Sequence, residues 1–461
     1  MIKFREKVAY GLGDMSSSMF WKIFGMYMLY FYTDVFGLAP AVVGWMFLVT
    51  RIWDTAADPV IGVLSDRTLT RWGKFRPYIL FGAVPFAVIG ALTFIVPDFS
   101  DGGKLVYAYV VYSLMMLVYS LVNVPYASLL GVMSPDPKDR NQLSSYRMFF
   151  AYAGSFISLA LVEPLVEIFT NIGPAPSPAR GWVMTIAVIG TICATLFLLC
   201  FAGTRERVAQ IEQKKNRVRD DVHDLLRNGP WWILLGAGVA ALLFNSIRDG
   251  ATIYYFKYYV LQTESVRIGG WLVTWSSLYL IVGQAANMVG VALSAPLSAK
   301  IGKKGVYIGA MAIATVLSAV FYSFTPDQMT LIFLFQILIS MCAGSIFPLL
   351  WSMYADIADH SELRTGRRAT GLIFSSSSMS QKLGWALGGA ITGWLLGFYG
   401  FEANQVQGEG AIHGIRMMLS WLPAMGTALS VIFISLYPLG EKRVREVAAE
   451  LERRRAAQNG Q

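Results

Sequence analysis

The chain has 461 residues, of which 55% are hydrophobic and only 15% are charged, and its formal net charge at pH 7 is +9. Soluble domains carry about 25% charged residues, so this composition excludes an ordinary soluble protein and indicates a polytopic membrane protein. The basic residues alternate with apolar segments instead of gathering on one soluble face, which argues against nucleic-acid binding.

Long apolar stretches recur along the whole chain. A stretch of about 20 apolar residues is long enough to cross a hydrocarbon core of about 30 Å as a helix. The sequence therefore predicts an all-α polytopic membrane protein with about twelve transmembrane helices. The predicted spans are residues 8–36, 40–64, 77–97, 104–133, 144–169, 181–203, 231–261, 270–299, 305–324, 329–355, 369–399 and 412–437.

A basic hydrophilic stretch, "TRERVAQIEQKKNRVRDDVHDLLRNGP", divides the predicted spans six and six. Its charge predicts an exposed connector with a helical middle. A weak repeat supports the division: "GVLSDRTLTRWGK" follows the second span and "GVALSAPLSAKIGKK" the eighth. The predicted parts are an N-terminal six-helix bundle (1–203), a cytoplasmic connector (204–230), a C-terminal six-helix bundle (231–438) and a cytoplasmic tail (439–461).

Basic residues follow the even-numbered spans and are scarce in the opposite loops. Cytoplasmic loops of membrane proteins carry the excess of Lys and Arg. We therefore predict that both termini are cytoplasmic and that the protein is integral to a bacterial inner (plasma) membrane.

Two carboxylates lie one helical turn apart in the second span, in "RIWDTAADP". Asp54 and Asp58 share one helix face, and Arg51 lies one turn before Asp54 on the same side. Two carboxylates this close in a low dielectric cannot both stay ionised without a counter-charge. A bound cation or a captured proton would supply it; a structural ion pair with Arg51 is the alternative interpretation.

Several motifs resemble those of a known family. "GVLSDRTLTRWGK" is similar to the signature of the loop between spans 2 and 3 in the major facilitator superfamily. Five further stretches, in the right order from residue 8 to about residue 435, resemble the glycoside-pentoside-hexuronide:cation symporters, the family that contains the melibiose carriers. They are "YFYTDVFGL", "RIWDTAADP", "RWGKFRPY", "YADIADHSELRTGRRATG" and "QKLGWALGGAITGWLL".

The resemblance implies the major facilitator fold and a secondary active transporter that works by alternating access. It implies import of a glycoside, pentoside or related sugar by symport with Na⁺ or H⁺. Asp54 and Asp58 match the coupling-cation positions of the melibiose carriers. No other cofactor is expected.

The fourth span contains "YSLVNVPYASL", which adds oxygen ligands for a cation. Sodium favours several oxygen ligands, so the predicted cation site is Asp54, Asp58, Ser120 and Asn123. The melibiose carriers have a carboxylate where this chain has Asn123, which leaves proton coupling open. An intramembrane Asn also serves in helix packing, which is the other interpretation.

Sugars are polyols with apolar faces, so their sites combine hydrogen-bonding side chains with aromatic rings. The predicted substrate-binding residues on spans 1, 4 and 5 are Asp14, Ser18, Trp21, Lys22, Tyr119, Asn123 and Arg147. The sugar-binding aspartate of the melibiose branch falls at Ser18 and its tryptophan at Ala127, which argues against melibiose itself. Lys22 is alternatively an ion-pair partner of Asp54 or Asp58.

The second half of the chain is predicted to complete the substrate site with Phe347, Trp351, Ser378, Lys382 and Trp385. A lysine deep in an apolar span must find an anion or a polar partner. Lys382 matches the family's lysine on span 11 and could neutralise Asp54 or Asp58 when the cation is absent. Phe347 and Trp351 are alternatively packing residues.

Charged residues near the cytoplasmic loops predict a gating network that holds the inner side shut in one state. Its predicted members are Asp66, Arg67, Arg71, Lys74, Asp356 and Asp359. Glu163 and Glu167, near the outer end of span 5, are interpreted as residues that only face water.

Other functions stay open at this point. A carrier of anionic hexuronides, or of an amphipathic lipid, would use the same fold. An enzyme is not predicted, because no constellation of His and Cys supplies a nucleophile with its base or a metal site. A channel would need a filter or pore-lining rings. The expected partners are a small sugar and membrane lipid, with no nucleic acid and no obligate protein partner.

Overall fold

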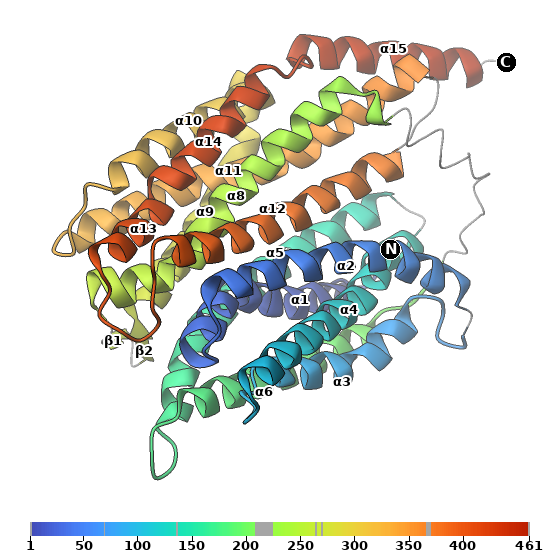
Figure 1. Cartoon of the computed structure of the whole chain (residues 1–461). Coiled ribbons are helices and arrows are strands. Elements are labelled where there is room, and N and C mark those ends of the chain that lie inside the picture. The colour runs from blue at the N-terminus through green and yellow to red at the C-terminus, as the bar shows by residue number, and fades with distance from the viewer. Residues whose placement is uncertain are drawn as a thin grey trace. The chain divides into compact units, whose positions relative to one another are not determined.

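The computed structural model describes residues 2–68, 70–134, 137–207, 225–262, 265–268, 271–365 and 370–459. The described chain is almost entirely helical (Figure 1). The elements of its first half are α1 (Phe4–Tyr30), the π-helical turn η1 (Phe31–Val35), α2 (Pro40–Arg67), α3 (Arg76–Leu92), α4 (Asp101–Met133), α5 (Pro137–Thr170) and α6 (Pro178–Gly203). Those of its second half are α8 (Gly229–Tyr254), η2 (Tyr255–Val260), β1 (Ser265–Ile268), β2 (Trp271–Thr274), α9 (Trp275–Ile301), α10 (Lys303–Phe321), α11 (Met329–Thr365), α12 (Thr370–Phe398), α13 (Glu409–Leu419), α14 (Trp421–Ser435) and α15 (Glu441–Asn459).

The helices confirm the polytopic membrane class. Each predicted span overlaps a helix, and eight helical segments of the described chain are long and apolar enough to cross a membrane. They are Asp101–Leu130, Gln142–Thr170, Pro178–Gly203, Gly229–Val260, Trp275–Ile301, Lys303–Phe321, Met329–Arg364 and Glu409–Ser435. The third predicted span is a shorter apolar helix, Arg76–Leu92. Residues 208–224, the predicted helical middle of the connector, lie outside the described residues.

Two of the predicted spans differ from the helices for a reason that the structure shows. The span predicted to start at residue 270 begins at Trp275, because the preceding residues form an antiparallel hairpin in which Ser265 pairs with Thr274. The last span is interrupted at Ser420. Pro423 has no N–H to bond the carbonyl of Leu419, and Arg248 Nη1 donates to that carbonyl at 2.7 Å instead.

The chain forms two compact units. Unit 1 comprises Met1–Ile211, Thr252–Ile281 and Gly389–Ala411, and unit 2 comprises Glu212–Ala251, Val282–Gly388 and Ile412–Gln461. Four helices, α8, α9, α12 and α13, have residues in both units. The division into two six-helix bundles at the connector stays a prediction.

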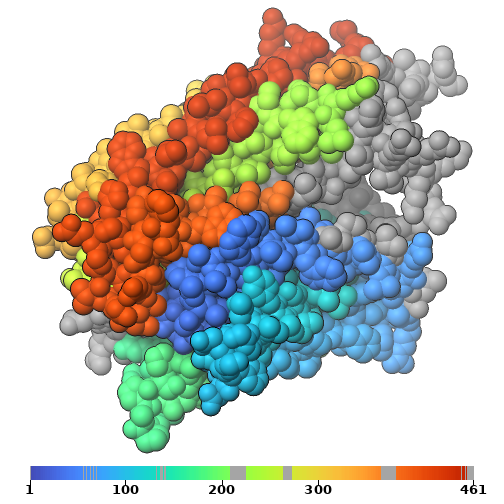
Figure 2. All heavy atoms as spheres, viewed as in Figure 1, coloured from blue at the N-terminus to red at the C-terminus, as the bar shows by residue number. Residues whose placement is uncertain are grey.

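Unit 1 is held together by close helix contacts. α1 packs on α5 and α6, and α3 packs on α4 and α6. A Cβ at Gly154 of α5 would lie 2.4 Å from the carbonyl oxygen of Met15, so only glycine allows this approach. The end of α12 packs on the start of α2, orange beside blue in Figure 2, and the ring centroids of Trp45 and Trp394 lie 4.9 Å apart.

The helix α2 has two contrasting faces. Trp45, Val49 and Ile52 are all at least half exposed and form an apolar face suited to lipid, whereas Arg51 and Asp54 are buried within the protein. The apolar residues are exposed because lipid, not water, is the solvent for this face. α2 therefore turns its charged groups inward, which is usual for functional intramembrane charges.

Unit 2 has a continuous apolar core. It is formed by α8, α10, α11 and α14, with Leu234, Met311 and Ile357 fully buried. Two of its buried hydroxyls pair with each other: that of Tyr307 lies 2.8 Å from that of Ser430.

Candidate functional site

The carboxylate of Asp54 is the most buried acid of the predicted site, with 1% of the residue exposed. Ser120 Oγ of α4 donates a hydrogen bond of 2.7 Å to its Oδ1. Arg51 Nη1 lies 3.4 Å from its Oδ2, one turn earlier on α2. Charge-assisted N–H···O bonds are usually about 2.7 to 2.9 Å long, so the ion pair is loose while the serine bond is tight.

The guanidinium of Arg51 contacts an aromatic ring as well as the carboxylate of Asp54. Its guanidinium carbon lies 4.5 Å from the ring centroid of Trp21 on α1. Trp21 in turn lies against Tyr119, with ring centroids 5.3 Å apart. The structure thus brings together an acid, a hydroxyl and two aromatic rings that the sequence assigned separately to cation and substrate.

Asp58 lies one turn after Asp54 on α2 and is half-buried. Asn123, also half-buried, donates Nδ2 to the carbonyl of Tyr119 at 3.1 Å. Because the amide nitrogen is turned to its own helix, the amide carbonyl oxygen is the atom that can serve as a ligand.

Asp14 and Arg147 form a second charged pair, between α1 and α5. Arg147 Nε donates to Asp14 Oδ2 at 2.8 Å. The guanidinium also lies 5.4 Å from the ring centroid of Tyr126, whose hydroxyl donates to the carbonyl of Tyr10 at 2.7 Å. The sequence predicted both charged residues for the substrate site but did not predict that they pair with each other.

The other predicted substrate residues fall into two groups. Ser18 and Lys22 are half-buried on α1, in unit 1. Lys382 and Trp385 are half-buried on α12, in unit 2, and the side chain of Ser378 lies outside the described part of the chain. The joining of the two groups around one substrate stays a prediction.

Phe347 and Trp351 of α11 line a small cavity in unit 2 with Tyr354 and Gln381. The cavity measures about 10 Å³, which is room for about one water molecule. Both aromatic side chains are half-buried. A ring face for a sugar and simple packing both remain compatible with this placement.

The predicted gating residues show different local partners. The guanidinium of Arg71 lies 4.2 Å from the ring centroid of Trp72, and Arg67 is exposed. Asp356 forms an ion pair of 2.7 Å with Lys303. Asp359 is half-buried, and the side chain of Asp66 lies outside the described residues. Lys303 is a partner that the sequence interpretation left out.

Two carboxylates that the sequence interpretation missed organise the loops beside α3 and α6. Glu206 accepts the backbone N–H groups of Lys74, Phe75 and Arg76 at 2.8 to 3.0 Å, at the start of α3. Glu6 accepts from both terminal nitrogens of Arg207 at 2.7 and 2.8 Å. These hydrogen bonds raise the pKa of Arg207.

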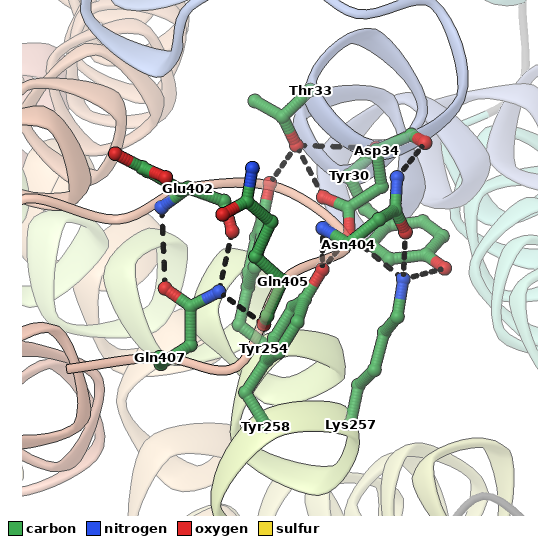
Figure 3. A network of polar contacts seen from close by, with 10 residues as sticks. All are labelled: Tyr30, Thr33, Asp34, Tyr254, Lys257, Tyr258, Glu402, Asn404, Gln405 and Gln407. Atoms are coloured by element: carbon green, nitrogen blue, oxygen red, sulfur yellow. Dashed lines mark hydrogen bonds and ion pairs between the residues drawn. The ribbon is translucent and has the colours of Figure 1, made fainter.

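A polar network that the sequence interpretation missed surrounds Asp34 of η1 (Figure 3). Lys257 Nζ of η2 donates to Asp34 Oδ1 at 2.8 Å, and the hydroxyl of Tyr258 donates to the same oxygen. Thr33 Oγ1 donates to Asp34 Oδ2 at 2.7 Å. The aspartate is 9% exposed, so the pair is shielded from bulk solvent.

Asn404, in the loop between α12 and α13, closes this network. Its Nδ2 donates to the backbone carbonyl of Asp34 at 2.7 Å, and its Oδ1 accepts from Lys257 at 2.8 Å. Asn404 has φ of 58°, the left-handed region that Asn tolerates better than most residues. Two sequence features could have indicated this network: an Asp in "YFYTDVFGL" and a Lys in "YYFKYYV", each flanked by aromatic residues.

The chain is similar to known transporters over nearly its whole length. The family described as "MFS/sugar transport protein" matches residues 9–441. The "Putative glycoside/cation symporter YagG" of Escherichia coli (strain K12) is 36% identical over 98% of this chain and 96% of that protein. The "Isoprimeverose transporter" of Lactiplantibacillus pentosus is 34% identical over 100% and 93%, respectively.

Solved structures share the fold at low sequence identity. The "Inward open conformation of the xylose transporter XylE from E. coli" aligns with a TM-score of 0.63 at 16% identity, over 96% of this chain and 98% of that one. The "Crystal structure of nucleoside transporter NupG" aligns with a TM-score of 0.64 at 13% identity, over 95% and 100%. These likenesses support the predicted major facilitator fold. The relatives are transporters, so the prediction that the protein is not an enzyme is confirmed.

The match over residues 9–441 and the relatives at more than 30% identity settle the family. The chain belongs to the MFS/sugar transport protein family, in the glycoside-pentoside-hexuronide:cation symporter group of the major facilitator superfamily.

Proposed function

We propose that this protein imports a neutral glycoside or pentoside across the bacterial inner membrane together with a small cation, by alternating access. The observation that carries the proposal is the carboxylate of Asp54, which is 1% exposed, accepts a hydrogen bond of 2.7 Å from Ser120 Oγ and lies 3.4 Å from Arg51 Nη1. A buried carboxylate needs a full counter-charge to be stable. A visiting cation supplies that charge.

The cation site in this proposal is Asp54, Asp58, Ser120 and Asn123. Ser120 Oγ already lies 2.7 Å from Asp54 Oδ1, and rotation of its hydroxyl proton would turn a lone pair toward an ion. Either Na⁺ or a proton satisfies the same electrostatic demand. The two ions are distinguished by uptake under separate sodium and pH gradients.

The sugar site in this proposal lies beside the cation site, around Trp21 and Tyr119. Their rings offer an apolar face, and Asp14, Ser18 and Lys22 offer hydrogen bonds. Arg147 is engaged by Asp14 at 2.8 Å, so its charge is balanced within the protein. This pairing favours a neutral sugar over an anionic hexuronide.

Coupling in this scheme is thermodynamic. Cation binding reduces the electrostatic free energy of keeping the acids buried and thereby raises the affinity for the sugar. By thermodynamic linkage, bound sugar raises the affinity for the cation by the same factor. A typical coupling of roughly 1 to 3 kcal/mol changes affinity about 5- to 150-fold. The membrane potential, negative inside, adds about 2.3 kcal/mol per charge per 100 mV to inward movement of the cation and so drives import of the sugar.

The direct test is uptake in proteoliposomes that contain the full chain, with a panel of neutral glycosides, pentosides and uronides. We expect a neutral sugar to accumulate only when an inward sodium or proton gradient is present. Equal uptake with and without each gradient would overturn symport. Preferential uptake of uronides would overturn the neutral substrate class.

A further inference from the structure

A cavity of about 710 Å³ lies in unit 1, lined by the ends of α1, α5, α6 and α8 and by β2. Small-molecule sites usually enclose about 300 to 1,000 Å³. Its lining includes the rings of Tyr30, Trp182 and Phe256, and it also includes the polar side chains of Glu163 and Gln262. Rings combined with hydrogen-bonding groups are the surface that a sugar requires.

Glu163 provides acceptor atoms on the cavity wall. It is half-buried, and the hydroxyl of Ser276 donates to both of its oxygens, at 3.1 and 3.0 Å. The groups of Tyr27 and Ser277 also lie near this carboxylate. A carboxylate has about four acceptor positions, and a ligand hydroxyl that enters the cavity would compete with these neighbours for them. Tyr27, also on the wall, lies beside Glu163, and within the described chain its buried hydroxyl makes no hydrogen bond of ordinary geometry.

The charged groups of the cavity favour a neutral ligand over an anionic one. Lys257 lines it, but its three N–H donors are already directed to Asp34, Tyr30 and Asn404, at 2.8, 3.1 and 2.8 Å (Figure 3). An ammonium group has three donors in total, and Asp34 balances its charge. Glu163 therefore faces the cavity without a cationic partner in the described lining.

We infer that this cavity is a second sugar-binding site, separate from the Asp54 region, that takes neutral glycosides through their hydroxyls on Glu163 and their apolar faces on Tyr30 and Trp182. The inference rests on the proposed function for the nature of the ligand.

A thiol-protection assay tests the site directly. A cysteine is introduced by Gln262→Cys, because Gln262 is exposed and lines the cavity. The background carries Cys342→Ala, since Cys193 and Cys200 are buried while Cys342 is half-buried. The full chain in nanodiscs is labelled with a thiol reagent in the presence of methyl β-glucoside, methyl β-xyloside or methyl β-glucuronide.

We expect the neutral glycosides to slow labelling and the glucuronide to have no effect. In Glu163→Gln, the half-protecting concentration should rise roughly 10-fold, because one hydrogen bond to a charged acceptor is lost. Asp98→Asn is the matched control: this exposed loop carboxylate lies outside the cavity lining and should leave protection unchanged. Protection by the glucuronide, or equal protection in Glu163→Gln, would overturn the inference.

Variants of the main sugar site distinguish ligand binding in the cavity from ligand binding in the main site. In Lys382→Ala, or in Ser18→Leu if that protein is recovered in better yield, protection by neutral glycosides should persist at the same concentrations. Loss of protection in these variants would show that occupancy of the main site alone causes it, and would overturn a separate site. Gradient-driven uptake without any protection would refute the second site while leaving the proposed function intact.

Discussion

Asp54→Asn is the sharpest test of the coupling mechanism. The substitution keeps the shape of the side chain and an acceptor for Ser120 Oγ, now at 2.7 Å from Asp54 Oδ1, but removes the negative charge. Two unit charges about 4 Å apart at an effective dielectric of 20 interact by about 4 kcal/mol. Removing one of them should weaken cation binding by nearly three orders of magnitude.

The transport consequence follows from the membrane potential. One charge moved through 100 mV is worth about 2.3 kcal/mol, which supports roughly 50-fold accumulation of a co-transported neutral sugar. We expect Asp54→Asn to equilibrate sugar without accumulating it, while sugar exchange between the two sides continues. The assay is uptake and counterflow in the same proteoliposomes at a fixed potential.

The control for this experiment is Asp98→Asn, which removes an exposed carboxylate in the loop between α3 and α4. It should accumulate sugar as the unchanged protein does. The reasoning is refuted if Asp54→Asn still concentrates sugar against its gradient, because the charge on Asp54 would then be unnecessary for coupling.

Three further substitutions test the packing and the missed polar networks. Gly154→Leu should lower the thermal unfolding midpoint strongly, since a side chain there meets the Met15 carbonyl; Gly102→Leu, with nothing within 4 Å, should leave it nearly unchanged. Asp34→Asn should destabilise the protein by about 1 to 3 kcal/mol, because Lys257 loses its charged partner; an unchanged midpoint would contradict a structural role for the network. Glu206→Gln should cost about 0.5 to 2 kcal/mol as the cap of α3 weakens, and unaltered hydrogen exchange at the start of α3 would argue against that cap.

The membrane class and the approximate spans could be read from the sequence because hydropathy is a local property. Each stretch of about 20 apolar residues must form its own hydrogen bonds as a helix in lipid, whatever surrounds it. The predictions failed where local chemistry depends on a distant group. The break at Ser420 combines Pro423, which is visible in the sequence, with Arg248, which is not near it in the chain.

Part of the candidate site could also be predicted, because the spacing of residues along one helix is a local property of the sequence. The spacing of Arg51 and Asp54 on one helix predicts their proximity, and the structure places them 3.4 Å apart. The order of the motifs indicated the family, which the comparisons confirm. The roles of the individual residues in binding cation and sugar stay predictions.

The sequence by itself determined that buried carboxylates and hydroxyls line certain helices, because helical periodicity assigns residues to faces. Only the tertiary structure decided which of them meet. Asp14 pairs with Arg147, and Asp34 with Lys257, across separations of 133 and 223 residues. Such pairs depend on how the helices pack side by side. A buried charged side chain forms its hydrogen bonds with the polar groups that this packing places within about 3 Å.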